Sequence, residues 1–572
     1  MRLIVFLAGL SVSAAAAFAQ APDFGPNVSI FSPNTPRATM QQEIDKVYAI
    51  EQHNEFGTER HAFLFLPGEY HVNVPIGFYT EVAGLGKTPD ATHLIGDVHV
   101  DAAARNNNAT TTFWRAAENF AVTPTGGTMR WAVSQAAPMR RLHVLGNLML
   151  HQHGWASGGW MSDTLVDGEV DSGPQQQWIS RNCDWKIWKG SNWNMVFVGV
   201  PEAPAGNWPQ PTFTEVEKAP LELEKPYLVA VDAQHWSIVV PQLRRDTSGT
   251  SWDHGVQPPA RTVSFRNVYV AHPGTDTAAS LNAQLAKGMN LLFTPGIYEL
   301  EQPLKVTHAN TIIMGLGFAT LKPMRGNAAV ETSDADGIVL TGLLIDAGEQ
   351  KSPVLVQIGP RGSSRNHHDH PIAVEDVFFR VGGAGIGKTN INLEINSRGT
   401  IVDHTWIWCA DHGDGVGWDK NVSNNGIVVN GDDVTIYGLF VEHHQQFQVL
   451  WNGNAGRTYF YQSEIPYDPP NQAAFSSAPG VNGWASYKVS DAVKQHEAWG
   501  LGVYSVFTHP DVFLSHAIET PQSPQVRFHH MITVCLGNNG GIRHVIDKAG
   551  DPTECAPHRV DSKLAEYPIP RK

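Results

Sequence analysis

The sequence has few cysteines and few charged residues. It contains 4 cysteines among 572 residues, and Asp, Glu, Lys and Arg together make up 17%. Four cysteines are too few for a disulfide scaffold, and none lies in a Cys-x-x-Cys pair of the kind that binds zinc. Cys535 and Cys555 are near enough in the chain to pair in an oxidising compartment, whereas Cys183 and Cys409 are far apart. We expect no metal site and no cofactor.

Long apolar runs are absent after the first twenty residues. Arg2 gives this segment a positively charged start, and an apolar run from Leu3 to Leu10 follows it. Ala17-Phe18-Ala19 then fits a small-x-small cleavage pattern. The pattern predicts a signal peptide over residues 1–19 and a secreted protein, extracellular or periplasmic. The alternative to a signal peptide is an apolar N-terminus that frays. We expect no membrane anchor, since a spanning helix needs about 20 apolar residues.

An excess of positive charge is also missing, because the net charge is −15. This charge argues against nucleic acid and acidic polysaccharides as partners, since both would be repelled. A neutral partner is favoured. The 17 tryptophans offer flat apolar faces on which sugar rings can pack, although most tryptophans are simply core.

A repeat divides the chain into two halves. Phe63-Leu-Phe-Leu-Pro-Gly-Glu-Tyr70 is followed by Pro75 and by Gly84-Leu-Gly86. Leu291-Leu-Phe-Thr-Pro-Gly-Ile-Tyr298 is followed by Pro303 and by Gly315-Leu-Gly317. Each copy follows a predicted helix, over residues 40–51 and 278–286 respectively. Such self-similarity in a fixed order indicates two copies of one architecture.

Many short β-rich segments follow each copy, such as 262–270, 337–345, 372–379 and 434–441. They are rich in β-branched residues and are separated by Gly, Asn or Asp turns with no helical period between them. This pattern is typical of a β-solenoid, with the helix covering the exposed sheet edge at its start. We predict an all-β chain of two tandem right-handed parallel β-helices, each with a short N-terminal capping helix. The expected domains are 20–268 and 269–545, followed by a loose tail over 546–572.

The segment 439–470 holds the strongest candidates for catalysis. It contains Glu442 and Glu464, with Trp451 and Tyr467 nearby as candidate substrate-binding aromatics. Partial burial of Glu464 would raise its pKa and keep it protonated, as a glycosidic acid requires. Alternatively, Glu464 caps a turn or pairs with Arg457.

Two further segments carry ionisable residues. Asp411, His412 and Trp418 lie in a stretch rich in Gly and Trp that either lines a substrate groove or forms an Asp/Gly turn. The cluster of three histidines in residues 366–370 suggests a metal, but adjacent residues of an extended chain point to opposite sides. We interpret this cluster as a solvated loop.

These motifs resemble glycoside hydrolase family 55, the β-1,3-glucanases with a dual, pectin-lyase-like β-helix. Val441-Glu442-His443 and Gln462-Ser463-Glu464-Ile465-Pro466-Tyr467 are similar to the family's Glu-His and QTETPY elements, with Ser463 and Ile465 in place of two threonines. Residues 173–182 resemble its NQQFTTRN element. The resemblance implies that Glu464 is the general acid, that Glu442 supports catalysis or binds substrate, and that Gln176 or Gln177 holds the nucleophilic water.

The resemblance further implies an inverting hydrolase that acts on a neutral β-glucan, with β-1,3-glucan as the favoured substrate. Glu442 and Asp411 are fallback bases, since no second carboxylate stands out in the N-terminal half. A polysaccharide lyase on the same fold and a non-catalytic glycan-binding β-helix are the alternatives. We expect a monomer whose partner is a polysaccharide.

Overall fold

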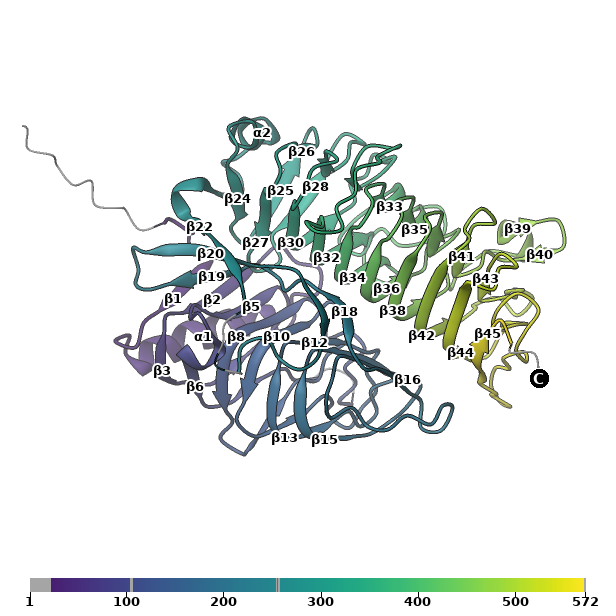
Figure 1. Ribbon diagram of the computed structural model, residues 1–572, viewed down its shortest axis with the longest axis horizontal. Helices are drawn as coiled ribbons and strands as arrows, with labels where there is room; N and C mark the ends of the chain where they lie inside the picture. The colour runs from purple at the N-terminus through teal and green to yellow at the C-terminus, as the bar shows by residue number, and fades with distance from the viewer. Residues whose placement is uncertain (1–21, 103–105, 254, 256–257, 570–572) are drawn as a thin grey trace, which may run out of the picture.

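Two stacks of short parallel strands make up most of the chain, as the computed structural model shows (Figure 1). The structure describes residues 22–102, 106–253, 255 and 258–569. The predicted signal peptide lies outside the described residues.

The N-terminal stack is built on one 15-stranded sheet whose strands pair in parallel with the next coil. Its main path comprises β1 (Val28–Phe31), β2 (His61–Phe65), β5 (Thr80–Gly84), β8 (Arg115–Thr123), β10 (Pro138–Val144), β12 (Trp160–Ser162), β14 (Gln177–Arg181), β16 (Asn194–Val198) and β17 (Phe213–Val216).

The C-terminal stack has two long sheets of 13 and 8 strands. The main path of the first comprises β23 (Val268–Ala271), β24 (Asn290–Phe293), β27 (Ile312–Gly315), β30 (Val339–Asp346), β32 (Ala373–Val381), β34 (Ile401–Cys409), β36 (Thr435–Glu442), β38 (Gly456–Glu464), β42 (His496–Ser505), β44 (Val526–Cys535) and β45 (Ser562–Tyr567). The second comprises β26 (Leu304–Val306), β29 (Val330–Thr332), β31 (Val356–Ile358), β33 (Thr389–Ile395), β35 (Ser423–Val429), β37 (Val449–Trp451), β41 (Tyr487–Val489) and β43 (Ile518–Glu519). The predicted class of two tandem parallel β-helices is therefore confirmed.

Each stack carries the predicted helix after its first strand. The helix α1 (Arg37–Glu51) buries Met40, Ile44 and Val47, which share one face because they lie four and three residues apart. The helix α2 (Ala278–Ala286) begins at Thr277, whose hydroxyl accepts a hydrogen bond from the Ser280 backbone N–H at 3.2 Å. The Ser280 hydroxyl accepts one from the Thr277 N–H in return, which completes a capping box.

Between the stacks, the chain folds into antiparallel strands. They are β18 (Ala219–Glu222), β19 (Tyr227–Ala230), β20 (Trp236–Pro241), β21 (Arg244–Thr247) and β22 (Ala260–Ser264). Apolar side chains of β19, β20 and β22 join one buried cluster with residues of both β-helices, among them Leu64 of β2 and Leu292 of β24. The connection therefore packs the two helices together.

The two β-helices also contact each other directly along their sheets. A buried cluster contains Trp114 and Trp160 from the first helix and Phe378, Trp406 and Phe440 from the second. Some backbone approaches leave room only for glycine. A Cβ on Gly438, whose φ is +61°, would lie 2.5 Å from the Trp160 ring.

A buried ionic network runs through the same interface. Arg140 and Arg181 come from the N-terminal helix, and both donate to Asp403 of β34 at 2.8–3.0 Å. Arg140 also pairs with Asp376 of β32, and Arg181 with Glu224 of the connection, each at 2.7 Å. Because all five groups are buried, the charges are desolvated and depend on one another.

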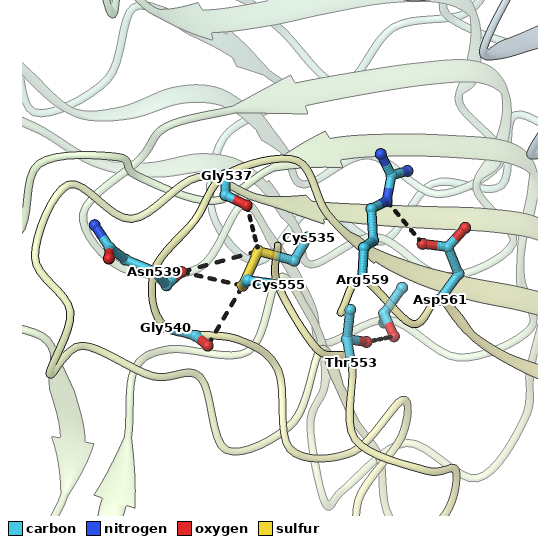
Figure 2. Close-up of a disulfide and its surroundings, with 9 residues drawn as sticks. Cys535, Gly537, Asn539, Gly540, Thr553, Cys555, Arg559 and Asp561 are labelled. Carbon is cyan, nitrogen blue, oxygen red and sulfur yellow. Dashed lines mark hydrogen bonds and ion pairs between the residues drawn. A yellow bond between two sulfur atoms is a disulfide. The ribbon is translucent and has the colours of Figure 1, made fainter. Parts of the chain in front are cut away.

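The C-terminal segment is more ordered than the loose tail that we predict from sequence. β45 pairs antiparallel with β44, and a disulfide joins Cys535 to Cys555 (Figure 2). The possible pairing of these two cysteines is confirmed, while Cys183 and Cys409 are buried and free. No helix among the described residues is long and apolar enough to cross a membrane.

Candidate active site

A cavity of about 350 Å³ lies where the two β-helices meet. Its volume falls in the range of sites for small molecules and short chains. The N-terminal helix contributes Thr110, Thr111, Phe113, Gln135, Ser157 and Gln176 to the wall, and the C-terminal half contributes Trp406, Trp408, Asp411, His412, Glu442, His443, Glu464, Tyr467 and Leu536.

Stacked coils bring the two glutamates together. Glu442 is the last residue of β36 and Glu464 is the last of β38, and these strands pair in parallel. Trp408 of the preceding coil pairs with Glu442, and Tyr504 of the following coil pairs with Glu464. Adjacent strands lie about 4.8 Å apart, so residues about twenty apart in sequence become neighbours.

Three donors hold the Glu442 carboxylate. Its Oε1 accepts hydrogen bonds from the amides of Gln135 at 2.8 Å and Gln462 at 2.7 Å, and its Oε2 accepts one from the Trp406 indole at 2.8 Å. Burial raises the pKa of Glu442, while the neighbouring His443 and the hydrogen bonds of Gln462 and Trp406 offset part of that shift. The Gln135 bond crosses from one helix to the other.

Glu464 has a more apolar setting. Its side chain has a single hydrogen-bond partner within the described protein, the Tyr467 hydroxyl, which donates to Oε2. Burial raises its pKa well above the usual range, and the nearby carboxylates of Glu442 and Asp411 raise it further. This environment keeps Glu464 protonated at a pH where an exposed glutamate is ionised.

Asp411 and His412 stand at the rim of the cavity, on the turn after β34. The imidazole Nδ1 of His412 lies 2.8 Å from Oδ1 of Asp411, and its Nε2 lies 2.7 Å from Oε1 of Glu55. Glu55 belongs to the loop after α1, so this group also joins the two helices. Both interpretations of the stretch that holds Asp411 and His412 apply, because it turns after β34 and lines the cavity.

The two candidate glutamines are placed differently. Gln176 lines the cavity, and its side-chain amide has no hydrogen-bond partner among the described residues. Gln177 does not line the cavity, because it is fully buried in β14 and its amide donates to the Ser157 carbonyl at 2.5 Å. Only Gln176 is therefore placed to contact a bound molecule.

The predicted aromatic residues also separate. Tyr467 lines the cavity, with its ring 4.3 Å from that of His443. Trp418 lines an adjoining cavity of about 170 Å³ that shares Asp411, His443 and Tyr467 with the first. Trp451 is fully buried in the interior of the C-terminal helix, so its predicted substrate contact is wrong. Side chains alternate between the two faces of a strand, and Trp451 lies on the face that points into the interior.

Sequence reasoning missed most of the N-terminal wall. Gln135, Ser157, Thr110 and Thr111 occur in no recognisable motif, and only the pairing of the two helices brings them to the cavity. Trp406 and Trp408 did carry a signal, because residues two apart on a strand share a face.

A metal site does not emerge from the described residues, which contain no group of three or more His, Cys, Asp or Glu side chains suited to hold an ion. The solvated-loop interpretation of residues 366–370 is wrong for His367. This side chain is fully buried and lies between Asp334 and Asp336, at 2.9 and 2.6 Å.

Comparisons with known proteins agree with this architecture. The family profile of the LAM55 pectate lyase-like domain matches residues 268–464. An exo-beta-1,3-glucanase of Streptomyces sp. (strain SirexAA-E / ActE) is 46% identical over 550 residues, which cover 96% of this chain and 90% of the relative.

Solved structures are equally similar. The structure of sacteLam55A from Streptomyces sp. SirexAA-E has a TM-score of 0.93 and 45% identity, over 96% of this chain and 100% of the other. A glutamate-to-alanine variant of sacteLam55A in complex with glucose gives the same TM-score and identity, over 97% of this chain and 100% of the other.

Proposed function

The chain belongs to glycoside hydrolase family 55 and is a glycoside hydrolase, and from that premise we propose that it cleaves β-1,3-glucan by inversion, with Glu464 as the general acid. The observation that carries the assignment is the buried Glu464 beside two further carboxylates in a cavity between the helices. The relative named an exo-beta-1,3-glucanase supports the choice of glucan.

Glu464 acts as the proton donor because its environment favours the neutral carboxyl. The Tyr467 hydroxyl occupies Oε2, which leaves Oε1 to carry a proton toward the glycosidic oxygen. Activity then requires protonated Glu464 and declines as the pH rises through its raised pKa.

The attacking water approaches from the N-terminal wall, which faces the carboxylates with amides and hydroxyls. The unpartnered amide of Gln176 orients this water. Glu442 has a supporting role beside the acid, because its carboxylate is held by donors from both helices and lies on the strand next to Glu464. A water held on the wall opposite the acid fits an inverting reaction, in which water displaces the leaving sugar from the opposite face.

The lining of the cavity suits a neutral sugar. It includes Phe113, Trp406 and Trp408 but no lysine or arginine among its described residues. His412 is matched by the carboxylates of Asp411 and Glu55, and the wall also carries Glu442 and Glu464. A lyase acting on acidic sugars would need an excess of cations here, so this lining favours hydrolysis of a glucan. Apolar aromatic faces pack well against pyranose rings.

Secretion is part of the same proposal. It is supported by the predicted signal peptide over residues 1–19 and by the Cys535–Cys555 disulfide, since disulfides persist in oxidising compartments. A polysaccharide substrate outside the cell fits this location. Cleavage after Ala19 can be checked by sequencing the N-terminus of the exported protein.

The central test is Glu464→Gln, assayed by sugar release from laminarin. We expect a loss of about 10²- to 10⁴-fold in kcat, the usual contribution of a general acid. Glu375→Gln is the matched control, because Glu375 is a fully buried glutamate on β32 that does not line the cavity. We expect it to keep its activity.

Product analysis separates the alternatives. Initial release of the α-anomer, followed by NMR, supports inversion, whereas an initial β-anomer contradicts it. An unsaturated product that absorbs in the ultraviolet would indicate a lyase. Laminarin binding without any product over days would indicate a glycan-binding protein.

A further inference from the structure

One loop of the N-terminal helix reaches across to the rim of the cavity. It spans residues 52–60, between α1 and β2. The backbone carbonyl of Glu55 in this loop accepts a hydrogen bond from the Tyr79 hydroxyl at 2.7 Å. This hydrogen bond anchors the loop to the N-terminal β-helix, next to the point where the loop contacts the C-terminal one.

The apolar part of this contact is Phe56. Its ring stacks with Trp408 of the cavity wall at 6.2 Å and an interplanar angle of 11°, and meets the His412 ring edge to face at 5.5 Å. Two glycines make room for it. A Cβ on Gly383 or Gly413 would lie 2.6 or 2.8 Å from the Phe56 ring. The backbone around the rim is thus fitted closely to this one side chain.

The polar part of the contact is a row of three hydrogen-bonded side chains, Glu55, His412 and Asp411. Both ring nitrogens of His412 face carboxylates, at 2.7 Å from Glu55 and 2.8 Å from Asp411. A neutral imidazole carries one N–H, so only the imidazolium can donate to both ionised carboxylates. Burial alone would lower the pKa of His412, but hydrogen bonds and charge from Asp411 and Glu55 raise it to about 9.

Asp411 and His412 both line the cavity, and Asp411 is the carboxylate of the row that does so. Burial alone would raise its pKa, but the hydrogen bond from His412 and the nearby His443 and His412 lower it. Its carboxylate is thus kept ionised and is oriented through Oδ1, which leaves Oδ2 to accept hydrogen bonds from sugar hydroxyls. Glu442 and Glu464 make no hydrogen bond with Glu55 or His412 in the described structure.

We propose that Glu55 and His412 are positioning residues, forming a clasp between the two β-helices that holds Asp411 in its substrate-binding orientation and releases it when His412 loses its proton. The inference rests on the proposed function and deepens it. The clasp fixes the orientation of Asp411, which within the described part of the chain makes no hydrogen bond with Glu464 and acts on the acid only through its charge. Loss of the clasp therefore weakens substrate binding more than it slows the chemical step.

The pH dependence follows from the groups that face the imidazole. Below a pH of about 9, His412 is protonated and bridges Asp411 on its own turn and Glu55 on the opposing loop. As the pH rises through this value, one N–H is lost and a lone pair faces a carboxylate. The KM for laminarin should therefore rise on the alkaline side around pH 9, separately from the decline of kcat that Glu464 controls.

The test compares Glu55→Gln and His412→Gln with the parent enzyme on laminarin from pH 5 to 10. In Glu55→Gln the rise in KM should begin at least one pH unit lower, because a charge that stabilises the imidazolium is gone. In His412→Gln the KM should be about 10-fold higher at every pH, without that rise. The kcat should change less than 3-fold in both variants.

His143→Gln is the matched control. His143 also bridges two carboxylates, Asp90 at 2.6 Å and Asp167 at 3.2 Å, but it does not line the cavity. It should leave KM and its pH profile unchanged.

NMR titration of the His412 ring provides a readout that does not need catalysis. Its pKa should lie near 9 in the parent and fall by one unit or more in Glu55→Gln. A His412 that titrates near 6.5, or an unchanged KM profile in both variants of an active enzyme, overturns the clasp and leaves the proposed function intact. A parent enzyme that releases no sugar from laminarin overturns the proposed function, whatever His412 does.

Discussion

The two β-helices share an architecture, yet they bring opposite chemistry to their common surface. Among the described lining residues of the cavity, the carboxylates Glu442, Glu464 and Asp411 come from the C-terminal half, while the N-terminal helix supplies amides, hydroxyls and one phenyl ring. The ionic network is divided in the same way between the two β-helices. The arginines Arg140 and Arg181 come from the N-terminal one, and the aspartates that they face come from the C-terminal one. Neither helix alone has a complete site, which makes their association a condition of activity.

Breaking the ionic network should have the largest effect. Arg181→Met leaves Asp403 and Glu224 buried without this partner, so we expect the free energy of unfolding to fall by about 3–5 kcal/mol. Denaturant unfolding measures the loss. Arg527→Met is the control, since Arg527 pairs with Glu497 on the surface and is 54% exposed. A change below about 0.5 kcal/mol is expected there. Equal losses in the two variants would contradict a special role for the interface.

Removing the amide of the N-terminal wall tests whether that wall takes part in the reaction. Gln176→Ala should lower kcat by about 100-fold, or roughly 2.7 kcal/mol, because the attacking water loses its orienting group. Steady-state kinetics on laminarin measures it. The neighbouring Gln177→Ala should instead lower stability by about 1 kcal/mol and change kcat less than 3-fold, because its amide bonds the Ser157 carbonyl. The reverse outcome would assign the water to Gln177.

Close packing of the helices can be tested at a glycine. Gly438→Ala places a methyl group 2.5 Å from the Trp160 ring and should cost about 2–3 kcal/mol in stability. Gly274→Ala is matched to it, because its φ of +73° imposes the same backbone strain while no atom lies within 4 Å of the added Cβ. Its cost should be only about 1 kcal/mol. The difference in thermal unfolding between the two variants isolates the contact with the Trp160 ring. No difference would mean that the two β-helices shift apart easily to accommodate the methyl group.

Several features followed from local pattern. The capping helices were predicted from the repeat, and α2 spans residues 278–286 as expected. The stacked parallel strands were predicted from short β-branched segments without helices between them. Glu442 and Glu464 were singled out because one aromatic-rich segment holds both and because their motifs resemble those of the family, and the structure places their strands side by side.

Other features depend on contacts between distant segments. Trp451 and Tyr467 looked alike in the sequence, yet one packs in the interior and the other faces the cavity. Strand alternation fixes two faces, but only the assembled coil decides which face is inside. Gln135 lies more than 300 residues from Glu442 and carries no motif, so nothing local could pair them.

The two β-helices and the capping helices could be predicted from the sequence because they rest on periodicity and an internal repeat, and the pair of candidate glutamates because an aromatic-rich segment and family-like motifs hold them. The tertiary structure alone decided which residues oppose that pair, that Gln176 and not Gln177 faces the cavity, and that Glu55 meets His412. Those choices depend on how one helix docks against the other, through buried aromatic, ionic and glycine contacts whose partners lie hundreds of residues apart.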